Sequence, residues 1–141
     1  MSARPALLLL LATILGAQLP TRSFDRVQLL ETTSENSAGV QVADLNRDGF
    51  LDIVLGKGRH GPLHNRVLLN NGKGGFTASN LGVTPDRTYS AALADLDLDG
   101  HLDIVVSNDE PDRKLLYHND GKGHFTEFGT FGAPEWSTRY V

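Results

Sequence analysis

Hydrophobic residues occur in short clusters along most of the chain, separated by polar turn residues. The clusters are rich in Val, Ile and Leu and are bounded by Gly, Asn or Asp. Short apolar segments of this kind are typical of β-strands, and no segment after the N-terminal apolar stretch has a helical period. The pattern predicts an all-β fold, with strands near residues 39–43, 51–55, 67–69, 90–94, 102–106 and 115–117.

These clusters form two copies of one repeat. The segment at residues 44–55 recurs 51 residues later, whereas the end of the repeat recurs after 49 residues, because the connection at residues 59–66 is two residues longer in the first copy. Asn71-Gly72 and Asp120-Gly121 are strong hairpin signals. A period near 50 residues with four short strands is typical of a propeller blade. The sequence therefore predicts two four-stranded antiparallel blades of an incomplete β-propeller, blade 1 over residues 24–82 and blade 2 over residues 83–131.

One loop in each repeat carries oxygen-bearing side chains at positions 1, 3, 5 and 9 and glycine at position 6. Such a cluster repels itself unless a cation screens it, and Ca²⁺ prefers six to eight oxygen ligands. We expect one Ca²⁺ in each loop, two in total, with position 7 adding a backbone carbonyl. The predicted ligands are Asp44, Asn46, Asp48, Phe50 and Asp52 in the first loop and Asp95, Asp97, Asp99, His101 and Asp103 in the second.

An EF-hand begins with similar residues but ends with Glu at position 12 and lies between helices. Position 12 is Leu55 in the first loop and Val106 in the second, and both lie in predicted strands. The last carboxylate comes at position 9 instead. The loops are therefore shorter than an EF-hand loop, and the remaining alternative to a calcium site is a solvated acidic turn.

The loop and the Leu-Asp-Ile-Val segment at its end resemble the FG-GAP/VCBS repeat, which occurs in integrin alpha subunits and many secreted bacterial proteins. The resemblance covers residues 36–131. It implies β-propeller blades with calcium held in the hairpin loop, but it does not imply one activity. Asn46 stands where Asp is commoner, so the second loop has one more carboxylate and is expected to bind calcium more tightly.

Two blades are fewer than the four to eight that close a propeller. Residues 132–141 resemble the start of a third repeat, because Thr138 follows Thr88 by about one period. We expect the chain to be part of a longer propeller protein. The alternative is a short protomer that completes a ring by self-association.

The N-terminus has the features of a secretory signal peptide. A basic residue, Arg4, precedes about a dozen apolar residues, and Gly16 and Ala17 suggest cleavage near residue 19. The sequence therefore predicts a secreted protein, extracellular or periplasmic, with no membrane span in the mature chain. The formal net charge of −4 and the lack of a basic stripe argue against nucleic-acid binding.

The sequence does not predict an enzyme. His60 and His64, in the longer loop of repeat 1, are read as polar loop residues or as a metal contact, and no catalytic motif accompanies them. Two functions remain: a binding or adhesion module for a protein or carbohydrate, or a scaffold attached to another domain. The sequence does not identify the ligand.

Overall fold

The computed structural model describes residues 27–32, 35–133, 135–136 and 138–139, and these residues form two four-stranded antiparallel sheets. No helix occurs in these described ranges, so the predicted all-β fold with two four-stranded sheets is confirmed. The predicted signal peptide at residues 1–19 lies outside the described residues. The strands of blade 1 are β1 (Ser37–Ala43), β2 (Asp52–Lys57), β3 (Leu63–Asn70) and β4 (Phe76–Asp86), and those of blade 2 are β5 (Thr88–Ala94), β6 (Asp103–Asn108), β7 (Lys114–Asn119) and β8 (Phe125–Phe131).

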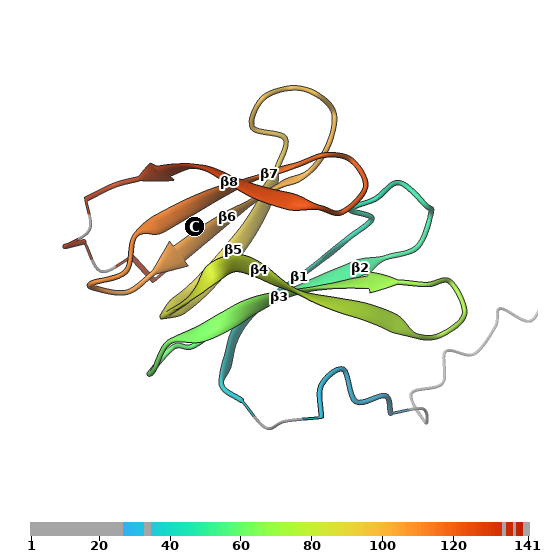
Figure 1. Ribbon diagram of the computed structural model, residues 1–141, viewed down its shortest axis with the longest axis horizontal. Coiled ribbons are helices and arrows are strands. Elements are labelled where there is room, and N and C mark those ends of the chain that lie inside the picture. Colours follow the sequence, from blue (N-terminus) through green and yellow to red (C-terminus); the bar gives the residue numbers. More distant parts are fainter. Residues whose placement is uncertain (1–26, 33–34, 134, 137, 140–141) are drawn as a thin grey trace, which may run out of the picture.

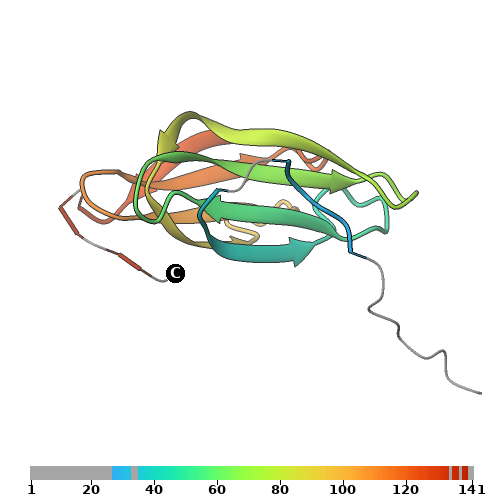
Figure 2. The same ribbon diagram turned by 90° about the horizontal axis from the view of Figure 1, so that it is seen from below.

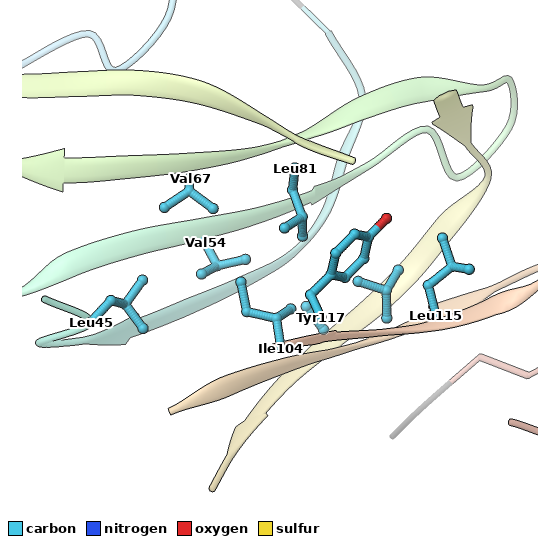
Figure 3. Close-up of a cluster of buried hydrophobic side chains, with 9 residues drawn as sticks. Leu45, Val54, Val67, Leu81, Ile104, Leu115 and Tyr117 are labelled. Atoms are coloured by element: carbon cyan, nitrogen blue, oxygen red, sulfur yellow. The ribbon is translucent and has the colours of Figure 1, made fainter. Parts of the chain in front are cut away.

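The two sheets stack face to face, and the order of strands in each sheet follows the chain (Figure 1). The first strands of the two blades, β1 and β5, pack against each other. Figure 3 shows apolar side chains from both sheets meeting in the space between them. Removal of this apolar surface from water is the main force that holds the blades together. The buried cluster contains Leu45, Val54, Val67, Leu81, Ala91, Ile104, Val106, Leu115 and Tyr117.

Both blades pair their first two strands in the same register. Ala43 lies opposite Asp52 in blade 1, and Ala94 lies opposite Asp103 in blade 2. A shift by one residue would move every side chain of a strand to the other face, so the register is fixed by the buried apolar face. The connection between these strands is therefore the same turn in both blades.

A buried line of polar side chains also connects the blades. The backbone amide of Lys57 donates to Asn65 Oδ1 at 2.7 Å, and Asn65 Nδ2 donates to Thr88 Oγ1 at 2.8 Å. The Thr88 hydroxyl then donates to Asn108 Oδ1 at 2.6 Å, and Asn108 Nδ2 donates to the Arg113 carbonyl. Buried polar groups are costly unless they are paired, so this line favours one relative position of the two blades.

The last strand of blade 1 is not among those that the apolar clusters of the sequence placed. It continues to Asp86, and blade 2 begins with Thr88, whereas the sequence places the end of the first repeat at residue 82. In this strand Asp86 pairs with Leu63, so β3 begins at Leu63, before the predicted start near residue 67, and includes His64. The prediction that both histidines lie in the loop is therefore wrong for His64. His60 does lie in the connection between β2 and β3.

An N-terminal segment crosses the face of blade 1 that is turned away from blade 2. Figure 2, seen from below, shows residues 27–32 in blue in front of the blade 1 strands. Lys57 is fully buried here, and its ammonium forms ion pairs with Glu31 at 2.6 Å and with Glu35. The pairing holds the pKa of the Lys57 ammonium above its ordinary value although burial acts in the opposite direction.

Candidate metal centre

The two acidic loops connect β1 to β2 and β5 to β6, and they lie at the same end of the two sheets (Figure 1). They also touch each other. The Arg47 guanidinium of the first loop donates to the Gly100 carbonyl of the second, and Asn119 Nδ2 of blade 2 donates to the Leu45 carbonyl at 2.8 Å. The two loops therefore form one continuous acidic region, with the Arg47 guanidinium between them.

In the second loop, the carboxylates at positions 1, 3 and 5 converge. Asp95, Asp97 and Asp99 each offer one oxygen, and these oxygens lie within 4.8 Å of one another. Asp95 Oδ1 is buried and accepts no hydrogen bond from the described residues. A buried carboxylate oxygen without a donor is costly, and a cation would satisfy it. The donor set, made only of carboxylate oxygens here, is the kind that Ca²⁺ prefers.

The backbone of each loop folds around its own carboxylates. Asp95 Oδ2 accepts from the Gly100 amide at 2.9 Å, and Asp44 Oδ2 accepts from the Gly49 amide at 2.9 Å. Both glycines have φ of 88°, which side chains rarely adopt, so position 6 requires glycine. The shared backbone hydrogen bond does not bring all the carboxylates together in both loops: those of the second loop cluster, whereas Asp44, Asp48 and Asp52 of the first loop form no such cluster in the described structure.

The first loop has the same backbone but a different charge. Its position 3 is Asn46, whose Nδ2 donates to Asp48 Oδ2 at 3.0 Å, while Asn46 Oδ1 accepts from the Asp48 amide at 3.2 Å. Because the Asn46 carboxamide is uncharged, the side chains of the first loop repel one another less than those of the second loop. A cation in the first loop would compete with this hydrogen bond for an Asp48 oxygen.

The aspartates at position 9 are placed differently from the others. Asp52 and Asp103 are fully buried, and each accepts two backbone hydrogen bonds. Asp103 Oδ2 accepts from the Leu96 amide and Oδ1 from the Asn119 amide, both at 2.9 Å. In blade 1, Asp52 accepts from the Leu45 amide at 2.9 Å and from the Asn70 amide at 2.7 Å. Each position 9 carboxylate thus ties the loop to the third strand, and this role comes in addition to the predicted metal contact.

The side chains at position 7 pack over the glycines of the neighbouring hairpin turn. A Cβ at Gly72 would lie 2.5 Å from the Phe50 ring, and a Cβ at Gly121 would lie 2.3 Å from the His101 ring. Glycine is therefore needed at both positions, because a side chain there would clash with the ring and because the backbone has a positive φ. The predicted role of Phe50 and His101 as carbonyl ligands stays a prediction.

A histidine outside the loop joins the second cluster. His118 Nδ1 lies 3.1 Å from Asp97 Oδ2 and 3.5 Å from Asp103 Oδ1, and the three residues form a group that could hold a metal ion. The corresponding residue of blade 1, 49 positions earlier, is Leu69. Sequence reasoning missed His118 because it lies in a strand. The signal was a polar residue at a position that is apolar in the other repeat.

A second histidine interacts with position 5 of the same loop. His101 Nδ1 lies 2.9 Å from Asp99 Oδ2, and the His101 amide donates to Asp99 Oδ1 at 2.8 Å. The hydrogen bond from the His101 side chain, followed by that from its backbone, lowers the pKa of Asp99 below its ordinary value. Asp99 is therefore ionised and available to a cation at neutral pH.

Comparison with known proteins assigns the repeat. The family model of the FG-GAP-like repeat matches residues 44–106 and again residues 95–141. The chain belongs to the FG-GAP-like repeat family. Each match begins at the first aspartate of an acidic loop, so the loops are part of the family repeat and not an insertion in it. A search of curated proteins found no match. Within the described residues, no helix is long and apolar enough to cross a membrane.

Proposed function

We propose that this FG-GAP repeat chain is a secreted calcium-binding module whose acidic loops each hold one Ca²⁺, and that the module binds a protein or carbohydrate outside the cell or in the periplasm. The observation that carries the metal proposal is the convergence of Asp95, Asp97 and Asp99, with Asp95 Oδ1 buried and unpaired among the described residues. The repulsion among these groups is relieved by a cation.

Calcium is the metal best supported by the donor chemistry. Carboxylate, carboxamide and backbone oxygens suit a hard cation, whereas thiolates and several imidazoles would favour a transition metal. His118 adds one nitrogen at the second site only, so the first loop is the simpler oxygen site. Isothermal titration of the protein, stripped with chelator, against CaCl₂, MgCl₂ and ZnCl₂ tests this choice. Tight binding of Zn²⁺ with none of Ca²⁺ would overturn it.

We expect the second loop to bind calcium more tightly than the first. It has four carboxylates against three in the first loop, and no carboxamide hydrogen bond has to be broken there. The variants Asp48→Ala and Asp99→Ala each remove position 5 of one loop. In calorimetry, the calcium affinity that remains in Asp48→Ala should exceed that in Asp99→Ala by about tenfold. Equal affinities in the two variants would contradict the ranking.

The proposal that the module recognises a ligand is based on its fold. Calcium would hold the loops rigid, and rigid loops on a stable sheet are common recognition surfaces. The alternative is a scaffold that spaces another domain. A glycan array and a pull-down with purified extracellular proteins, each run with calcium and with chelator, separate the two. Calcium-dependent retention supports recognition, and its absence in all formats supports the scaffold.

We propose no catalytic role for the described residues. The carboxylates of the loops would be held ionised by a bound cation, so they would be poor general acids. His60 lies in the connection between β2 and β3, and His64 lies within β3 with its Nδ1 buried and unpaired. Neither histidine belongs to a cluster of possible metal ligands within the described chain.

A further inference from the structure

A small cavity lies at the end of the sheets opposite the acidic loops. Its volume is about 170 Å³, and it is lined by Ala38, Arg59, Tyr89 and Arg139. Ala38 and Tyr89 are the second residues of β1 and β5, whereas the acidic loops follow the last residues of these strands. Arg59 comes from the connection between β2 and β3, and Arg139 comes from the segment after β8. Four separate parts of the chain therefore meet at this cavity.

Two guanidinium groups share the ring of Tyr89. Arg59 Cζ lies 5.3 Å from the ring centroid and Arg139 Cζ lies 5.7 Å from it, both within the range of cation–π contacts. The ring attracts each cation, but it cannot neutralise their charge. Two like charges at one small cavity repel each other unless an anion lies between or beside them.

Neither arginine has a carboxylate partner among the described residues. The other two arginines near this end of the sheets do have one: Arg87 pairs with Asp112 at 3.2 Å, and Arg113 pairs with Glu127 at 3.2 Å. Arg59 and Arg139 form no ion pair within the described ranges. Their positive charge borders the cavity, and no ion pair within the described ranges neutralises it.

We propose that this cavity is a binding site for an oxyanion, namely the carboxylate, sulfate or phosphate group of a ligand. Guanidinium groups present planar sets of donors that match such oxygens, and charge-assisted hydrogen bonds of this type are about twice as strong as neutral ones. Tyr89 holds both guanidiniums in position. The volume has room for one oxyanion with a few waters, not for a large apolar group. None of the four residues belongs to an acidic loop, so the inference does not depend on calcium binding.

The test is a titration of the ¹⁵N-labelled full chain, followed through the arginine Nε–Hε resonances in NMR spectra. Sodium sulfate and sodium acetate are the two probes, at constant ionic strength, once with calcium and once with chelator. We expect saturable shifts of the Arg59 and Arg139 resonances. Arg59→Gln and Arg139→Gln should each weaken binding at least about tenfold. Preference for sulfate or for acetate assigns the site to a tetrahedral or a planar group.

Arg113→Gln is the matched control, because this arginine lies near the same end and is already paired with Glu127. It should leave the affinity unchanged. Arg59 and Arg139 are both exposed residues, so both glutamine variants should keep the fold. Shifts that rise linearly at all arginines, or equal loss in the Arg113→Gln control, would overturn the proposal. Because both metal states are titrated, failure here is separable from failure to bind calcium.

Discussion

Replacement of Asp103 by alanine is expected to lower the free energy of unfolding by about 2–6 kcal/mol, even when calcium is removed with chelator. The Asp103 carboxylate is fully buried and accepts the backbone amides of Leu96 and Asn119. Alanine leaves both amides without a partner, and each unpaired buried amide costs about 1–3 kcal/mol. Urea unfolding followed by far-UV circular dichroism, with and without calcium, measures the loss.

Asp97→Ala is the matched control within the same loop. Asp97 is exposed, so its removal in chelator should change the free energy of unfolding by less than about 1 kcal/mol. Asp103→Asn keeps one acceptor oxygen, so its free energy of unfolding should fall between those of Asp103→Ala and Asp97→Ala. This variant allows the comparison even if Asp103→Ala does not fold. Equal stability of Asp103→Ala and Asp97→Ala in chelator would show that Asp103 acts only as a metal ligand.

Replacement of Asp86 by asparagine is expected to stabilise the protein above pH 7 and to have no effect near pH 4. Burial, followed by repulsion from Asp112 and Glu127, raises the pKa of Asp86 to about 6, and Asp86 Oδ2 has no hydrogen-bond partner among the described residues. Attraction to Arg113 and a hydrogen bond with Asn108 offset only part of this.

The sign of the pH dependence follows from the raised pKa of Asp86. The folded protein holds the Asp86 proton more tightly than the unfolded chain, so ionisation of Asp86 costs stability. The cost is absent below the ordinary pKa of 3.8, grows as the pH rises, and is complete above about 6. A pKa that is higher by one in the folded protein than in the unfolded chain costs about 1.4 kcal/mol, so the asparagine variant should gain about 2–3 kcal/mol at pH 8. Urea unfolding between pH 4 and pH 8 measures this gain.

Asp120→Asn is a control of opposite sign. Hydrogen bonds from the His124 ring and from the Lys122 amide hold the pKa of Asp120 at about 2, so its ionised form contributes stability that is lost only as the pH falls toward 2. The asparagine variant at this exposed site should be slightly less stable than the wild type at neutral pH. If Asp86→Asn also lost stability at pH 8, the assignment of Asp86 as an uncompensated buried acid would be wrong.

The repeat itself made most of the fold predictable. Two copies of the same apolar clusters, turns and loops predicted two four-stranded sheets, because short apolar segments and Gly-containing turns depend on local chemistry. The end of β4 was not predictable in this way. Residues 82–86 extend the strand because Asp86 pairs with Leu63, and a pairing across the sheet is not visible in the local sequence.

The acidic loops were predicted as a set, but the direction of each side chain was not. Spacing could not show that Asp103 points inward to backbone amides while Asp95, Asp97 and Asp99 converge near the surface. His118 joins the cluster only through the pairing of β6 with β7. The extension of β4 and the place of His118 were missed because both depend on how neighbouring strands pair.

The line of polar side chains between the blades has a consequence for how similar repeats avoid wrong partners. Two similar units in one chain are prone to exchange places with each other or with a neighbouring molecule during folding. In this protein, Asn65 donates to Thr88, which in turn donates to Asn108. The residues of blade 1 at the positions of Thr88 and Asn108 are Ser37 and the ion-paired Lys57. A second blade 1 in the place of blade 2 would bring a buried ammonium to a site that fits a carboxamide. The junction therefore selects the correct neighbour as well as its orientation.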